Sequence, residues 1–240
     1  MDDRLLTKRH TMNTKNCKPS ICIPKIVTCK GRQLDPFHLT EEDIDLEEIA
    51  HSLSLQCRYN GATPGMYSVA KHSCIAAAYE LYRTSDPALA LGMLLHDAAE
   101  AYIGDYVRPL KNKFTHVLQR TVKLSYNIRT GESDLGLYIQ QERAKMNAHA
   151  IELLTVERRI DSLLLRKFGA RRSKDWHDID DRLAALEMLE MFGIELPGVE
   201  PLDAELRMDE AFPRAKEQFL SLANGFIHLM NQPANCTYKE

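Results

Sequence analysis

The spacing of apolar residues along this chain predicts a mostly helical protein. Leu46, Ile49 and Leu53, for example, recur at three- and four-residue intervals, which is the period of an amphipathic helix. The chain has no alternating strand and helix units, so the expected fold class is all-α, a helical bundle. The expected helices cover residues 41–57, 68–81, 87–102, 112–128, 137–168, 175–192, 203–211 and 213–230.

Turn residues mark the expected ends of these helices. Ser68 and Asp86 are expected N-caps, because their side-chain oxygens can accept hydrogen bonds from a first helical turn. Pro87 follows at a position that suits proline, and Gly193 lies where a helix is expected to end. A short hairpin is expected near the start, with strands at residues 26–29 and 32–34 around Lys30-Gly31.

Composition limits the function classes without selecting one. The formal net charge is -3 over 240 residues, which gives no support for a nucleic-acid polymer or a membrane surface as partner. The six cysteines form no CxxC pair, so reduced thiols are expected. With no apolar run of membrane-spanning length and no secretory pattern at residues 1–4, we expect a cytoplasmic protein.

The doublet His96-Asp97 is the strongest chemical signal in the chain. Residues 87–95, which precede it, carry no charge, and a helix that is apolar on all sides is buried. Burying an imidazole and a carboxylate at the end of such a helix is costly unless a partner satisfies them. The sequence therefore predicts a buried polar centre with a metal ion as its natural occupant.

Three further residues can join the doublet. Glu100 lies three and four residues beyond it, on a neighbouring part of the same expected helical surface. His72 and Asp180 lie in two other expected helices. Taken singly, His72 is more often a core histidine, and Asp180 a surface acid or an N-cap. Taken together on three apolar helices, His72, His96, Asp97 and Asp180 favour a divalent metal centre over these structural roles.

Longer blocks of sequence around these residues carry a family resemblance. The chain resembles the HD-domain metal-dependent phosphohydrolases, and within them the subgroup of 5'-deoxynucleotidases and phage-type dATP triphosphohydrolases. The matching blocks, which together span about residues 40 to 195, are Ile49–Tyr59, Tyr67–Ser73, His96–Asp105, Arg108–Lys111 and Ile179–Glu187.

The resemblance implies which residues bind the metal. They are His72, His96, Asp97 and Asp180, holding a zinc, cobalt, manganese or magnesium ion. Asp161 is an alternative to Asp180 as the last ligand. Asp180 is preferred because the family has the same Asp-x-Arg pattern with a glutamate seven residues beyond the aspartate.

The remaining site residues follow from this reading. Glu100 and Asp105 are the expected catalytic acids, which orient water or move a proton. Asp105 can instead hold the 3'-hydroxyl of a sugar. Basic groups are expected on the phosphates, and two rings are expected to stack on the base; these substrate-binding residues are Arg58, Lys71, Lys111, Tyr59 and Pro109.

The expected reaction is hydrolysis at the 5' phosphate of a deoxynucleotide, with a dNTP, and dATP first, as substrate. Alternatives are a 5'-deoxynucleotidase acting on dNMPs, a non-catalytic nucleotide-binding HD module, and a structural helical bundle. The resemblance implies a homo-oligomer built from dimers, in the host cytoplasm if the chain is phage-encoded. Expected segments are a flexible leader at 1–24, the HD domain at 25–200 with an insertion near 114–150, and a C-terminal helical extension at 201–240.

Overall fold

A computed structural model describes residues 25–126, 134–202 and 214–232. The protein is mostly helical with one small antiparallel sheet, as predicted. The expected leader at 1–24 and the expected helix at 203–211 lie outside the described residues. Among the described residues, no helix combines the length and the apolar character needed to cross a membrane.

The described residues form two short strands, two 3-10 helices and a series of α-helices, of which the fifth and sixth are the longest. The strands are β1 (Ile26–Val27) and β2 (Gln33–Leu34), and the 3-10 helices are η2 (Glu41–Asp43) and η3 (Arg58–Gly61). The α-helices are α1 (Leu46–Leu55), α2 (Val69–Thr84), α3 (Pro87–Leu94), α4 (Glu100–Ile103), α5 (Arg108–Tyr126), α6 (Asp134–Phe168), α7 (Trp176–Phe192) and α8 (Ala215–Met230).

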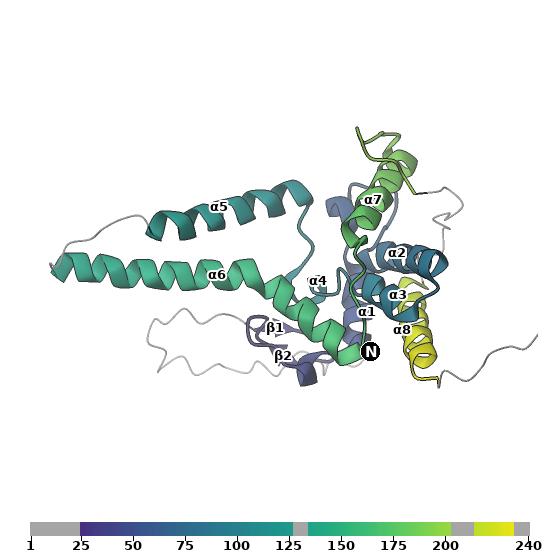
Figure 1. Cartoon of the computed structure of the whole chain (residues 1–240), viewed down its shortest axis with the longest axis horizontal. Coiled ribbons are helices and arrows are strands. Elements are labelled where there is room, and N and C mark those ends of the chain that lie inside the picture. Colours follow the sequence, from purple (N-terminus) through teal and green to yellow (C-terminus); the bar gives the residue numbers. More distant parts are fainter. Residues whose placement is uncertain (1–24, 127–133, 203–213, 233–240) are drawn as a thin grey trace, which may run out of the picture.

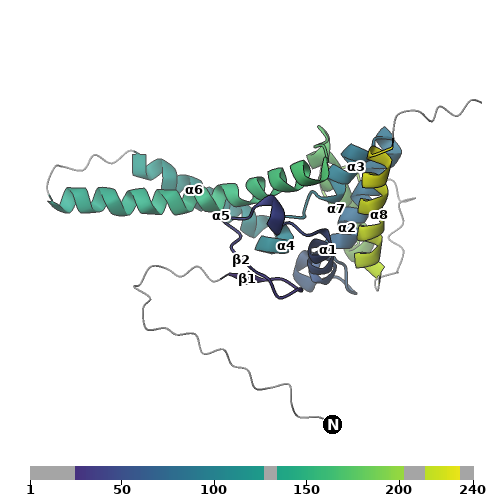
Figure 2. The ribbon, with the colours of Figure 1, turned by 90° about the horizontal axis from the view of Figure 1, so that it is seen from below.

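The helices form a packed body from which one helix pair projects. Helix α2 packs against α1, α3, α7 and α8. Helices α5 and α6 lie side by side and extend away from this body in both views (Figures 1 and 2). The C-terminal half of α6 returns to the body, where Val156, Ile160 and Leu164 are buried in the core.

Two apolar clusters meet along α2. The larger joins side chains of α1, α2, α3, α6 and α8, and it contains Val69 and Ala70 of α2. The smaller joins α2 to α7, and it contains Ile75 and Ala76. His72 lies between these two pairs of residues and is fully buried. The packing therefore places a polar side chain at the boundary between two apolar clusters, where it needs polar partners.

The expected hairpin is present. Ile26 pairs with Leu34, and Val27 pairs with Gln33. The buried carboxylate of Glu48 in α1 accepts hydrogen bonds from Thr28 Oγ1 at 2.5 Å and from Arg32 Nε at 3.2 Å. The hairpin is thus attached to α1 by a charge-assisted contact, which is stronger than a bond between neutral groups.

The expected helix at 41–57 begins later than predicted. The structure has the 3-10 turn η2 first, and α1 starts only at Leu46. Asp45 is the reason, because its carboxylate accepts hydrogen bonds from the backbone N–H groups of Glu47 and Glu48. An N-cap of this kind stabilises a helix by about 1 kcal/mol and requires a non-helical backbone at the cap residue.

The expected buried helix at 87–102 is interrupted, and this corrects the prediction. Helix α3 ends at Leu94, turns follow over residues 95–99, and α4 begins at Glu100. Within the turns, the N–H of Ala98 donates to Leu95 O and the N–H of Glu100 donates to Asp97 O, both at 3.0 Å. Bonds to the third preceding residue tighten the chain relative to an α-helix.

The expected loop at 105–110 is also shorter than predicted. Helix α5 begins at Arg108, so Pro109 lies in its first turn. Proline is tolerated there because first-turn N–H groups have no partner within the helix. The N-cap roles of Ser68 and Asp86 are confirmed, and Gly193 has the left-handed backbone expected after α7.

We expect Gly92→Ala to destabilise the fold by about 3 kcal/mol, because it overpacks the core. A methyl carbon on Gly92 would lie 1.9 Å from the backbone oxygen of Arg171. Gly225→Ala in α8 is the matched control, since a methyl carbon there meets nothing within 4 Å. Urea unfolding should show the control to be about 0.5–1 kcal/mol more stable than wild type. Equal stabilities for the two variants would contradict the close contact.

Candidate metal centre

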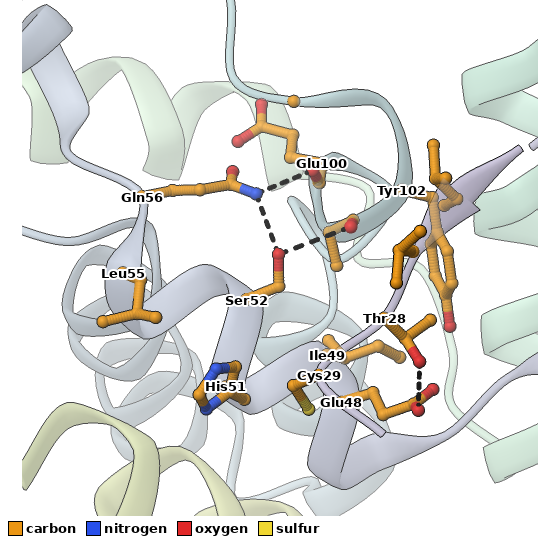
Figure 3. A pocket seen from close by; sticks show the side chains of 14 residues that line it. Thr28, Cys29, Glu48, Ile49, His51, Ser52, Leu55, Gln56, Glu100 and Tyr102 are labelled. Carbon is orange, nitrogen blue, oxygen red and sulfur yellow. Dashed lines mark hydrogen bonds between the residues drawn. The ribbon is translucent and has the colours of Figure 1, made fainter. Parts of the chain in front are cut away.

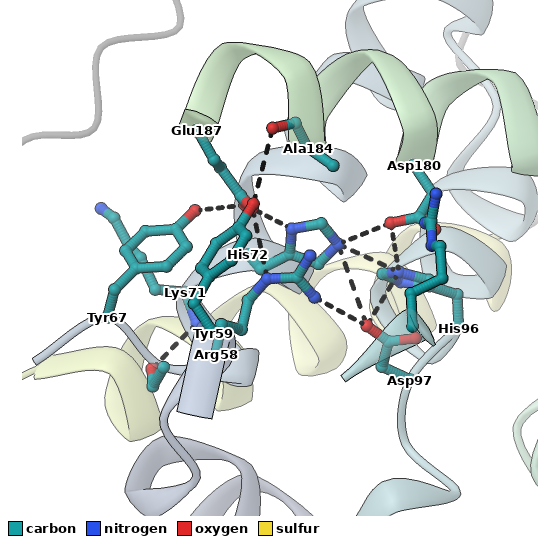
Figure 4. Close-up of polar contacts among 12 residues, drawn as sticks. Arg58, Tyr59, Tyr67, Lys71, His72, His96, Asp97, Asp180, Ala184 and Glu187 are labelled. Atoms are coloured by element: carbon teal, nitrogen blue, oxygen red, sulfur yellow. Dashed lines mark hydrogen bonds and ion pairs between the residues drawn. The ribbon is translucent and has the colours of Figure 1, made fainter. Parts of the chain in front are cut away.

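Three separate elements bring the predicted metal ligands together (Figure 4). His72 lies in the first half of α2, His96 and Asp97 lie in the turns at 95–99, and Asp180 lies in α7. His72 and His96 are buried, with exposed fractions of 0% and 6%. Asp180 is partly buried, so one side of the group remains accessible.

Two of the three distances among these groups match those of metal ligands. His72 Nε2 lies 3.2 Å from His96 Nε2 and 3.1 Å from Asp180 Oδ1, while His96 Nε2 lies 3.8 Å from that oxygen. Two atoms about 2.1 Å from one ion lie roughly 3.0–3.6 Å apart in tetrahedral or octahedral coordination. His72, His96 and Asp180 can therefore hold a metal ion.

Both imidazole rings are held through their other nitrogen. His72 Nδ1 lies 2.5 Å from Glu187 Oε1, and His96 Nδ1 lies 2.8 Å from the backbone oxygen of Met93. Where each Nδ1–H donates to its acceptor, each Nε2 of the neutral ring is free of a proton and can bind an ion. Metal-binding histidines in proteins are oriented in this way. The two Nε2 atoms lie 3.2 Å apart, so both can reach one ion placed between them.

Asp97 lies beside this group of three. Its Oδ2 is 3.1 Å from His96 Nε2 and 3.8 Å from His72 Nε2. Consecutive residues of a regular α-helix point about 100° apart, which would separate the side chains of the doublet. The turns at 95–99 allow both His96 and Asp97 to approach the same point, so the interruption of the expected helix builds the site.

The charges at this centre reinforce one another. Burial and the charge of Arg58 would lower the pKa of His72, but Glu187 and Asp180 raise it. Burial would lower the pKa of His96 too, but Asp97 and Asp180 hold it well above its usual range. Burial would raise the pKa of Asp97 and of Asp180, but the two imidazoles lower both. The centre thus retains its carboxylate charges, as a cation site requires.

Asp161 is not part of the group. It lies in α6, where burial and the neighbouring Glu157 raise its pKa to about 7. The structure therefore brings Asp180, the preferred candidate, to the two histidines.

Two residues without a predicted role hold the centre in place. Glu187 accepts from His72, and Arg108 Nη2 lies 2.8 Å from the second oxygen of Asp180. The sequence carried one signal for Glu187, its spacing of seven residues from Asp180. The pairing of Arg108 with Asp180 joins the start of α5 to α7.

The predicted phosphate-binding residues make different contacts. Arg58 lies beside the centre, with Nη1 3.5 Å from Asp97 Oδ2 and Nε 3.3 Å from Glu187 Oε2. Lys111 Nζ lies 2.6 Å from Glu157 Oε1 in α6. Lys71 is buried in α2, and its side chain runs away from His96 and Asp180 (Figure 4).

The two residues predicted to stack on a base lie on different elements. Tyr59 is in η3, its hydroxyl donates to Glu187 Oε2 at 2.6 Å, and its ring packs edge-on against Phe192. Pro109 is exposed in the first turn of α5. Their predicted stacking on a nucleobase stays a prediction.

Glu100 lines a cavity and is influenced by the charge of Asp97. The cavity is about 440 Å³ in volume and lies between the hairpin, α1 and α4, with Glu100 and Gly104 in its lining (Figure 3). Burial, with the nearby charges of Asp97 and Asp105, raises the pKa of Glu100 to about 10. Burial also raises the pKa of Asp105. The charge of Asp97 thus acts to raise the pKa of both predicted catalytic acids. Glu100 carries a proton at neutral pH.

Comparison with known proteins finds relatives without an assigned activity. No protein-family model matches the chain. The chain is 42% identical over 87 residues to an uncharacterized protein of Rhodobacter capsulatus, covering 34% of this chain and 43% of that protein. It is 32% identical over 104 residues to the uncharacterized protein YfdR of Escherichia coli K12, covering 43% of this chain and 56% of that protein. The chain thus spans about half the length of these relatives.

We expect His72→Ala to lose bound metal, because it removes one of three ligands that lie within reach of a single ion. Metal content after dialysis against zinc or manganese, measured by inductively coupled plasma mass spectrometry, tests this. His228→Ala on the exposed surface of α8 is the matched control and should keep wild-type content. Equal metal in the two variants would show that His72 is a core histidine and not a ligand.

Proposed function

We propose that this chain is an HD-domain metal-dependent phosphohydrolase that acts on the 5' phosphate of a deoxynucleotide. The observation that carries the proposal is the convergence of the Nε2 atoms of His72 and His96 with the carboxylates of Asp97 and Asp180. In both rings Nδ1 already has an acceptor, so both Nε2 atoms are available to an ion. Polarised phosphoryl oxygens and activated water are the chemistry that a divalent ion supplies when bound at such a site.

The acids beside the centre suit proton transfer. Hydrolysis of a phosphate ester requires an acid for the leaving oxygen as well as a nucleophilic water. Glu100 carries a proton at neutral pH, lines the cavity, and lies close enough to Asp97 for that charge to raise its pKa. We assign it as the general acid. Asp105, on the loop after α4, orients the water or holds the sugar 3'-hydroxyl.

Cationic side chains near Asp97 suit a phosphate chain. Arg58 is within 3.5 Å of Asp97, so a phosphate at the metal would also contact its guanidinium. The charge of Lys111, in the first turns of α5, acts to lower the pKa of Asp105 and of Glu100, while its Nζ pairs with Glu157. Two cationic groups in addition to a metal favour a triphosphate over a monophosphate, which supports a dNTP with dATP first. We also propose that the protein is cytoplasmic and that it forms a homo-oligomer built from dimers.

We expect the purified protein to release tripolyphosphate and deoxyadenosine from dATP when Mn²⁺, Co²⁺ or Zn²⁺ is present. Anion-exchange chromatography of reactions with dATP, dADP and dAMP identifies the products. Release of phosphate from dAMP alone would make the protein a 5'-deoxynucleotidase. Metal binding and nucleotide binding without turnover would identify a non-catalytic nucleotide-binding module and overturn the enzyme proposal.

We expect Glu100→Gln to lower kcat by about 100-fold or more while metal content stays at the wild-type value. A general acid acts in its protonated form, so wild-type activity should fall as pH rises through the pKa of Glu100. A bound cation opposes the charge of Asp97 and moves this pKa below 10. The variant should lack this alkaline decline.

Glu80→Gln is the matched control for this experiment, because Glu80 is also a buried glutamate but lies in α2 and pairs with Arg83. It should keep both the rate and the pH profile of the wild type. An unchanged pH profile in Glu100→Gln would rule out Glu100 as the acid.

A further inference from the structure

Glu187 is a buried carboxylate that accepts hydrogen bonds from four donors. It lies in α7 with an exposed fraction of 0%, seven residues beyond Asp180. Its Oε1 lies 2.5 Å from His72 Nδ1 and 2.8 Å from the Tyr67 hydroxyl. Its Oε2 lies 2.6 Å from the Tyr59 hydroxyl and 3.3 Å from Arg58 Nε. An ionised carboxylate offers about four acceptor positions, so these donors fill it.

The four donors lie on segments whose relative positions determine the geometry of the metal centre. Arg58 and Tyr59 lie in η3, Tyr67 lies just before α2, and His72 lies within α2. Figure 4 shows Glu187 between the tyrosines and the imidazole of His72, with Asp180 on the far side of that ring. One side chain of α7 therefore connects the loop, the ligand-bearing helix α2 and the helix that carries Asp180.

The backbone conformation at Tyr59 allows the side chain to reach the carboxylate of Glu187. Tyr59 and Asn60 have φ values of 55° and 53°, in the left-handed region that costs energy for residues other than glycine. The loop is closed by a hydrogen bond of 2.9 Å from the Arg58 N–H to Tyr67 O. This conformation delivers the side chains of Arg58 and Tyr59 to one carboxylate, which explains why the unfavourable backbone persists.

We propose that Glu187 is a positioning residue for the metal centre. By accepting the Nδ1 proton of His72, it fixes the tautomer that presents the Nε2 lone pair to the ion. Its other three donors hold the loop and α7 at the spacing that places Asp180 beside His72. The proposal rests on the metal centre, but it does not depend on the identity of the substrate.

Burial of a carboxylate does not by itself give this role. Glu80 is also fully buried and ionically paired, yet it contacts Arg83 and lies on the same helix as His72 without touching that ring. Glu80→Gln thus removes a buried charge of the same kind from α2 and leaves the Glu187 contacts in place. It is the matched control for loss of a buried ion pair.

The test is Co²⁺ binding by the full chain, followed through the visible absorption of the bound ion. We expect Glu187→Gln to bind Co²⁺ 10- to 100-fold more weakly than wild type, the size of effect typical of lost hydrogen-bond partners of metal ligands. Its absorption spectrum should also change, because the His72 ring is no longer fixed. Glu187→Asp keeps the charge on a shorter side chain and should recover part of the affinity.

A second measurement reports the tautomer directly. ¹⁵N spectra of histidine-labelled protein distinguish a ring protonated at Nδ1 from one protonated at Nε2. In the metal-free wild type, at a pH where the ring is neutral, His72 should carry its proton on Nδ1, and Glu187→Gln should show exchange between the two tautomers. A structural role for Glu187 would change the melting temperature but not this signature.

The outcomes separate this inference from the proposed function. If the wild type binds no Co²⁺, the metal centre itself is wrong. If the wild type binds Co²⁺ and Glu187→Gln binds it equally well, or if Glu80→Gln loses as much affinity, the positioning role is overturned. Should Glu187→Gln fail to fold, Tyr67→Phe replaces it, because it removes one donor from Oε1. A loss of affinity in that variant supports the role, and unchanged affinity overturns it.

Discussion

The burial of charged groups at one boundary between two apolar clusters is the constraint on which this structure depends. His72, Glu187 and His96 lie where α2, α3 and α7 meet, almost out of contact with water. Charged groups in such surroundings are tolerated only when each has partners at hydrogen-bonding distance. The surrounding helices must therefore be held within a narrow range of positions, and the N-caps, the turn contacts and the close packing at Gly92 contribute to this.

The projecting helix pair is also connected to the centre. Arg108 opens α5 and binds both Asp180 and Asp181 in α7, while Lys111 binds Glu157 in α6. The first turn of α5 is therefore anchored next to a proposed metal ligand, although most of the helix extends away from the body (Figure 1). Any partner that moved this pair would act on Asp180 through Arg108, because the two side chains are directly hydrogen-bonded.

Much of the fold was predictable because it depends on local chemistry. The side chains of Ser68 and Asp86 cap helices whichever tertiary structure surrounds them, and Gly193 suits a left-handed helix end for a similar reason. The start of α1 was misplaced because the pattern of apolar residues continues through Asp45, which acts as the cap. The interruption at residues 95–99 was missed because residues 93–99 carry no glycine or proline that would separate a helix from tight turns.

The sequence by itself determined the secondary structure class, most helix ends and the residue types of the candidate centre, since these follow from periodicity and from individual side chains. Only the tertiary structure decided how those residues meet. It directs the side chains of His96 and Asp97 toward the same point and brings Asp180, not Asp161, to the two histidines. It also places the carboxylate of Glu187 beside Nδ1 of His72. These relations join residues 24 to 115 positions apart. They arise from the packing of α2 against α3 and α7, which no local pattern specifies.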